Sequence, residues 1–123
     1  MTWLRKAWDW IAHLWKNPDG YYGRPIKYAI NQGPGHFVAV GFIPVAVFDF
    51  SILILLIGFG VWEVTQWHFR GADPYDCVED WCFVAAGALS GLHWIMTLLI
   101  VPVALVFWAN GVLLRIKERR DGL

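Results

Sequence analysis

The sequence predicts an all-α integral membrane protein, a hairpin of two transmembrane helices preceded by an amphipathic helix at the membrane interface. Of its 123 residues, 58% are hydrophobic and only 16% are charged, whereas a soluble domain carries about 25% charged residues. A chain this short leaves much of its surface exposed. The chain also contains two long apolar stretches, and its acidic and basic residues are segregated along its length. An ordinary soluble monomer is therefore not expected.

The two apolar stretches are the predicted transmembrane helices. Residues 36–61 contain a single charge, Asp49, and residues 82–108 contain no Asp, Glu, Lys or Arg. Both exceed the about 20 residues that a helix needs to cross a bilayer. Helices are expected because lipid offers the backbone no hydrogen-bond partners. Pro44 and Pro102 should kink them.

Charge orients this hairpin in the membrane. Residues 1–35 carry five basic residues against two acidic ones, and residues 109–123 carry four against two. Residues 62–81 carry five acidic residues and one basic residue. Because cytoplasmic segments are enriched in Lys and Arg, we expect both termini in the cytoplasm, residues 62–81 as an acidic extracytoplasmic loop, and residues 109–123 as a basic tail.

Residues 1–35 are expected to hold an interfacial helix and a linker rich in Gly and Pro. Within residues 2–17 the apolar side chains recur at helical spacing, and basic and polar side chains fill the other side. This pattern is typical of a helix lying in the membrane interface. Packing of the same face on a partner subunit is the alternative. Asn17-Pro18-Asp19-Gly20 ends the helix with turn residues.

Two polar residues interrupt the apolar stretches. A charge at the depth of Asp49 costs at least a few kcal/mol, so Asp49 should be protonated, paired or turned toward a protein interior on one continuous, kinked helix. The alternative is a tight turn at Asp49 that makes a re-entrant hairpin of residues 36–48 and 50–67. His93 is expected to bond a neighbouring helix.

The acidic segment contains a candidate site. Asp76 and Asp80 are four residues apart and would share one face of a helix. One interpretation is a divalent-metal or acid–base pair supported by Glu63 and His36. The other, which we favour from the sequence, is a solvated loop whose Asp80 caps the second transmembrane helix and complements its dipole.

Cys77 and Cys82 lie in or beside the same segment. A disulfide is one reading for an extracytoplasmic loop, and free thiols are the other. Their spacing is wider than that of usual zinc-binding cysteine pairs. No cofactor is predicted, and the sequence does not decide whether a metal binds.

Gly87 and Gly91 form a GxxxG pattern in the second apolar stretch. Small residues at this spacing let another helix backbone approach closely. The pattern suits packing within the hairpin and self-association equally.

Residues 35–91 resemble the VanZ-like group of small bacterial membrane proteins, some of which are associated with glycopeptide resistance. The matching pieces are Gly35-His36-Phe37, Gly41-Phe42-Ile43-Pro44, Trp62-Glu63 with Gln66 and Arg70, Asp76 to Asp80, and Gly87-Ala88 with Gly91. The resemblance implies a bacterial inner-membrane location. It also implies that one membrane face gathers His36, Glu63, Arg70, Asp76 and Asp80.

Three functions follow from these observations. We expect first a non-enzymatic membrane subunit that assembles with itself or with a larger complex in the lipid bilayer, because the chain holds nine tryptophans, a glycine pattern and no familiar catalytic motif. The second is an acid–base or metal site at the membrane face. The third is a phage holin-like permeabiliser. The net charge of zero argues against nucleic-acid binding.

Overall fold

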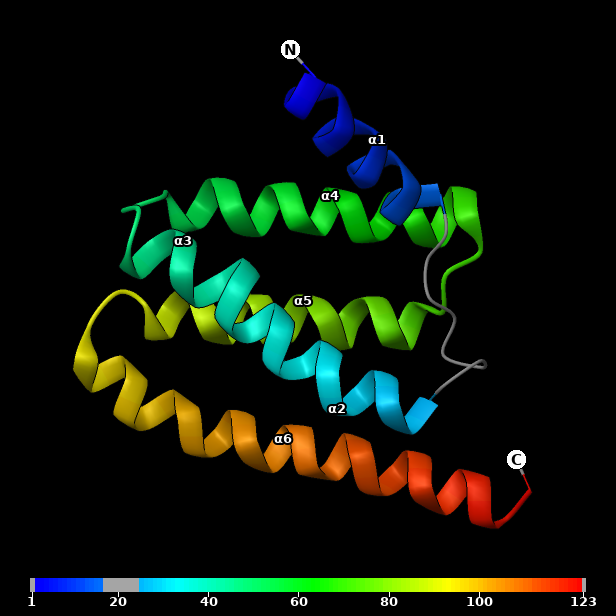
Figure 1. Ribbon diagram of the computed structural model, residues 1–123. Coiled ribbons are helices and arrows are strands. Elements are labelled where there is room, and N and C mark those ends of the chain that lie inside the picture. The colour runs from blue at the N-terminus through cyan, green and yellow to red at the C-terminus, as the bar shows by residue number, and fades with distance from the viewer. Residues whose placement is uncertain (1, 17–24, 123) are drawn as a thin grey trace.

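The computed structural model describes residues 2–16 and 25–122, and these residues contain helices and no strand (Figure 1). The all-α prediction is therefore confirmed. The elements are α1 (Thr2–Lys16), α2 (Pro25–Gly35), the π-helix η1 (His36–Phe42), α3 (Ile43–Ala46), α4 (Ile52–Arg70), α5 (Pro74–Ser90) and α6 (Trp94–Arg120).

The described residues form an antiparallel bundle of four long helices, with α1 packed against α4 (Figure 1). One of the four is continuous through α2, η1 and α3, and we call it the α2–α3 helix. The turns at residues 47–51 and 91–93 lie at one end of the bundle. The turn at residues 71–73 lies at the other end, together with the start of α2 and the end of α6.

The π-helical segment lies between two prolines. Pro34 and Pro44 have no backbone N–H and so cannot continue an α-helical hydrogen-bond ladder. The N–H of Ile43 instead reaches back five residues to the Val38 carbonyl. Pro44 then lies in the first turn of α3, where a missing N–H costs little. Pro44 thus follows closely on a widened helical segment, a form that is frequent at functional sites.

The prediction of one continuous helix over residues 36–61 is wrong, because the chain turns at Asp49. Asp49 has a φ of 55°, in the left-handed region that Asp tolerates better than most residues. The Phe50 N–H donates to the Pro44 carbonyl at 2.9 Å, and Ser51 caps the start of α4. The tight-turn alternative is the one that the structure adopts.

The prediction of one helix over residues 82–108 is also wrong, because α5 ends at Ser90. His93 is the N-cap of α6 and accepts a hydrogen bond from the Ile95 N–H at 3.1 Å. It therefore caps its own helix instead of bonding a neighbouring one. Asp49 and His93 are both exposed and lie in turns at the same end of the bundle.

The acidic segment is helical instead of a loop. Helix α4 continues to Arg70 and ends on Gly71, whose φ is 70°. Asp73 starts α5 by accepting from the Tyr75 N–H at 2.8 Å. The expected cap, Asp80, lies instead in the middle of α5. The short turn between α4 and α5 lies at the same end of the bundle as the end of α6, whereas a two-helix hairpin would place this segment opposite the C-terminus.

Glycines bring η1 and α5 into backbone contact. A Cβ on Gly87 would collide with the Phe37 carbonyl, and a Cβ on Gly41 would collide with the Val84 carbonyl. A Cβ on Gly91 would lie 3.0 Å from the Phe42 carbonyl oxygen. The structure thus places the GxxxG pattern in packing within the chain.

The bundle buries polar groups and exposes apolar ones. Among the described residues, seven buried side chains are polar or charged and five are hydrophobic, the reverse of a soluble protein. Helices α4, with 19 residues, and α6, with 27, are long and apolar enough to cross a membrane. Their outer faces are apolar, with exposed Leu53, Ile54, Ile57, Val61, Leu98, Leu99, Val103 and Val106.

Candidate functional site

The site begins with one face of α5. Asp76, Glu79 and Asp80 are buried, and the same face continues one turn later with the buried Phe83 and Val84. Positions three and four apart on a helix share a face. On this face the first two turns of α5 are therefore acidic and the following turns are apolar. The buried acidic side chains thus lie toward the end of the bundle at which α5 begins.

His36, Glu63 and Asp80 meet in the interior of this end. Each comes from a different helix, and each offers a ligand atom that lies within 4.8 Å of the other two. Glu63 and Asp80 are each only 5% exposed. The His36 Nδ1 lies 3.7 Å from the Asp80 Oδ1. We call these three residues the carboxylate–histidine cluster.

Local contacts orient the His36 ring. Its Nδ1 lies 2.8 Å from the Gln32 carbonyl oxygen, one turn earlier, and the Phe59 ring packs edge-on at 5.5 Å between centroids. A neutral His36 that donates Nδ1–H to Gln32 keeps the lone pair on Nε2. The lone pair of that tautomer can accept a proton or bind a metal through Nε2. The nitrogen that lies 3.7 Å from the Asp80 Oδ1 is Nδ1, which would act as the ligand only in the other tautomer.

Beside this cluster lies a buried ion group centred on Arg115. Its guanidinium makes two contacts of 3.1 Å with the Glu79 carboxylate, and its Nη2 lies 3.7 Å from the Asp76 Oδ1. Its Nη1 also donates to the Gly111 carbonyl at 3.2 Å. A Cβ at Gly111 would lie 3.1 Å from the Arg115 Nη1, so this glycine makes room for the ion group.

The charges do not balance inside the described bundle. Four buried carboxylates, of Glu63, Asp76, Glu79 and Asp80, face one buried guanidinium. Buried like charges are disfavoured unless protons or cations offset them. The guanidinium offsets one negative charge. His36 lies beside Asp80 and offsets a second charge when it is protonated, and bound protons or a bound cation would offset the others.

Two further polar groups complete the interior. The Cys77 thiol hydrogen-bonds the Glu63 side chain, and Gln66 is buried one turn after Glu63. Cys77 and Cys82 are both free thiols, so the disulfide alternative is not what the structure contains.

The structure unites most of the residues singled out in the sequence. It brings His36, Glu63 and Asp80 together and places Asp76 beside them against Arg115. Arg70 lies exposed at the end of α4 and outside this group. The favoured view of a solvated acidic loop is wrong, because these carboxylates are buried.

Sequence reasoning missed Cys77 as a member of the buried interior and Arg115 as its counter-charge, and it gave Gln66 and Glu79 no specific role. The missed signal for Arg115 was its place as the first charge after the apolar part of α6. Five acidic residues with one neighbouring basic residue also required a counter-charge from elsewhere.

Comparison with protein-family models, curated proteins and solved structures gave no match to this chain.

Proposed function

We propose that this chain is a membrane protein that binds a divalent transition-metal ion through His36, Glu63 and Asp80 and uses it for acid–base or hydrolytic chemistry. The observation that carries the proposal is the convergence of these three ligand atoms within 4.8 Å, from three helices, in a buried place. The VanZ-like resemblance also supports the proposal, because three of the residues that the resemblance singles out, His36, Glu63 and Asp80, are the ones that converge.

The donor set favours particular metals. One imidazole nitrogen with two carboxylate oxygens suits ions such as Zn²⁺ or Mn²⁺, and sites made only of oxygens suit Mg²⁺ or Ca²⁺. A three-ligand site keeps a position open for water, which a bound metal makes more acidic. The neighbouring Asp76 and Cys77 add polar groups that could exchange protons with such a water.

The distribution of basic residues along the bundle supports a cytoplasmic side for the site. Arg70, Lys117, Arg119 and Arg120 lie at the end that holds the cluster, while the described turns at the other end carry Asp49 and no Lys or Arg. The positive-inside rule favours this basic end as the cytoplasmic one. We therefore propose a site near the cytoplasmic face of a bacterial inner membrane, with α1 in the interface.

Metal analysis of the purified protein tests this function. We expect wild-type protein, extracted in mild detergent and loaded with Zn²⁺, to keep about one ion per chain after desalting. His36→Ala and Glu63→Gln should lose it. Asp49→Asn, at an exposed carboxylate in the distant turn, is the matched control and should retain it. Wild-type protein without bound metal by mass spectrometry would contradict the proposal.

Assembly with itself or with a larger complex is a second candidate. The observation in its favour is the apolar face that α1 leaves uncovered, with Leu4, Trp8 and Ile11 all exposed. Light scattering in mild detergent is the test, and a monodisperse monomer that copurifies with no other chain would contradict it.

A further inference from the structure

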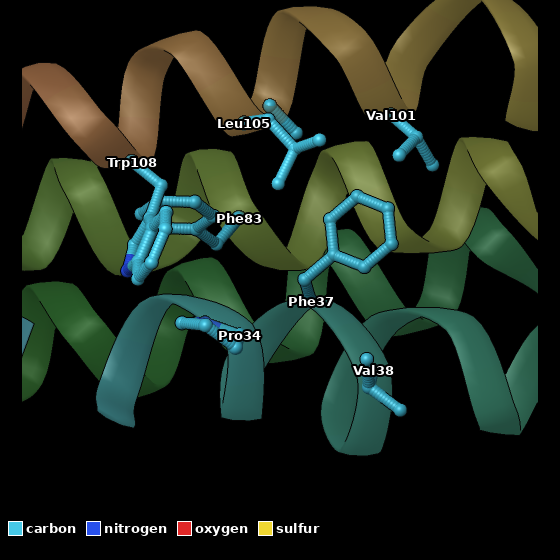
Figure 2. Close-up of a pocket in the computed structure, with 8 residues that line it drawn as sticks. Pro34, Phe37, Val38, Phe83, Val101, Leu105 and Trp108 are labelled. Carbon is cyan, nitrogen blue, oxygen red and sulfur yellow. The ribbon is translucent and has the colours of Figure 1, made fainter. Parts of the chain in front are cut away.

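An apolar groove runs along the bundle between η1, α5 and α6. Its volume is about 310 Å³, within the about 300–1,000 Å³ of typical small-molecule sites. Figure 2 shows Phe37 and Val38 on one side, Val101 and Leu105 on the other, and Phe83 with Trp108 at one end. Aliphatic and aromatic side chains line it throughout.

The groove adjoins the polar interior. Phe37 follows His36 directly, and Phe83 lies one helical turn after Asp80. Gly33 packs against both Phe83 and Trp108, and Gly111, which contacts the ion group, follows Trp108 by one turn. Along the bundle axis, the apolar groove is therefore the layer next to the buried carboxylates.

The rim of the groove is continuous with the apolar exterior. Val38 is 47% exposed and Leu105 is 56% exposed, and Leu105 neighbours the exposed Val103 and Val106 on α6. A cavity lined only by apolar groups does not hold ordered water. Its opening is on the surface that would face hydrocarbon if α6 crosses a membrane. From Val101 to Trp108 the groove follows α6 for about 10 Å, at about 1.5 Å per residue.

We propose that this groove binds one acyl chain of a membrane lipid, so that the polar part of the same molecule reaches the carboxylate–histidine cluster. The inference rests on the proposed function and narrows its substrate class to an acyl-chain amphiphile. A hydrocarbon chain matches the groove in polarity, volume and surroundings, and the buried carboxylates begin one helical turn before Phe83 on α5, beyond one end of the groove.

Photo-crosslinking of the full chain tests the groove. The protein is reconstituted in vesicles of phosphatidylcholine and phosphatidylglycerol that contain a phosphatidylcholine with a diazirine on one acyl chain. After irradiation, mass spectrometry maps the labelled residues. We expect label to concentrate on the groove-facing residues of η1 and α6, several-fold above the outer face of α6.

A substitution that fills the groove can be compared with the same substitution on the outer surface. Ala104→Trp places an indole inside it, whereas Val106→Trp places the same side chain on the outer surface, where Val106 is 71% exposed. Label at the groove should fall several-fold in the first variant and stay unchanged in the second. Val101→Phe is the milder substitution if Ala104→Trp loses helical circular dichroism.

The outcomes separate this inference from the proposed function. Equal labelling of the groove and of the outer face of α6 would overturn the lipid groove. Label that persists at the groove in an Ala104→Trp protein that still folds would also overturn it. Absence of lipid label at the groove of the wild-type protein, with label on the outer face of α6, would likewise overturn it. Because Zn²⁺ retention is measured on the same samples, wild-type protein that labels at the groove yet binds no metal counts against the metal site alone.

Discussion

Arg115 has 1% of its side chain exposed and lies among carboxylates on α5. Burial of a guanidinium is tolerated only where ionic and hydrogen-bond partners replace water. Glu79, Asp76 and the Gly111 carbonyl supply those partners here. The arginine therefore lowers the electrostatic cost of holding several acidic groups in one interior and fixes α6 against α5.

We expect Arg115→Gln to destabilise the fold by about 3–5 kcal/mol, because it leaves the Glu79 carboxylate buried without its counter-charge. Arg115→Lys should recover only part of the loss, since an ammonium cannot reproduce the two-pronged contact. Thermal unfolding in detergent, followed by circular dichroism, is the measurement. Arg120→Gln, at an exposed arginine that pairs with Asp121, should change stability by under about 0.5 kcal/mol. Equal effects at the two positions would refute the role assigned to Arg115.

The sequence predicted site residues correctly where the spacing between them showed that they share a helix face. The four-residue interval between Asp76 and Asp80 places both on one helix face, and His36 and Glu63 are the residues expected to support that pair. Arg115 escaped because a basic residue near a C-terminus has the pattern of a cytoplasmic tail. Its burial depends on how α6 packs on α5, and a single sequence contains no direct signal for that contact.

At the scale of elements, the closest packing in the bundle is between η1 and α5. Gly41 and Gly87 face each other's helix backbone, so even a methyl group has no space there. This contact carries Asp80 toward His36, because both residues lie one to two turns from it on the same two helices. The glycines thus position the site as well as pack the fold.

Gly87→Ala should therefore cost about 1–3 kcal/mol, the usual cost of overpacking, and should also weaken Zn²⁺ retention by displacing α5 from η1. Gly58→Ala in α4 is the matched control, since a Cβ there meets nothing within 4 Å. It should be neutral or stabilise by up to about 1 kcal/mol through helix propensity. Unfolding in mixed micelles and metal content report the two effects. A Gly87→Ala protein as stable as Gly58→Ala would show that the helices are not in backbone contact.

Hydropathy predicted helices but not where they end. Each apolar stretch contains a turn that hydropathy does not reveal. The first stretch turns at residues 47–51 and the second at residues 91–93. The deciding signals are local: Asp49, whose turn is the alternative for the first stretch, with the capping Ser51, and Gly91 with the capping His93 in the second stretch. A capping residue inside an apolar stretch outweighs the length of that stretch, because it supplies the backbone partners that a helix start needs.

For the whole molecule, the number of long helices decides which parts of the chain lie on the same side of the membrane. A two-helix hairpin separates the acidic segment from both termini. The bundle instead places the turn at residues 71–73 beside the end of α6, and the turns at 47–51 and 91–93 opposite (Figure 1). If all four helices cross the membrane, the two arrangements therefore predict opposite sides for Ala72.

Single cysteines distinguish these arrangements. In a background of Cys77→Ala and Cys82→Ala, we expect Phe50→Cys and Leu92→Cys to react with a membrane-impermeant maleimide added outside intact cells. Ala72→Cys and Arg120→Cys should react only after the membrane is opened, because the basic residues hold their end of the bundle in the cytoplasm. External labelling of Ala72→Cys with protection of Arg120→Cys would restore the two-helix hairpin. It would also place the carboxylate–histidine cluster on the outer side of the membrane, contrary to the proposed cytoplasmic location.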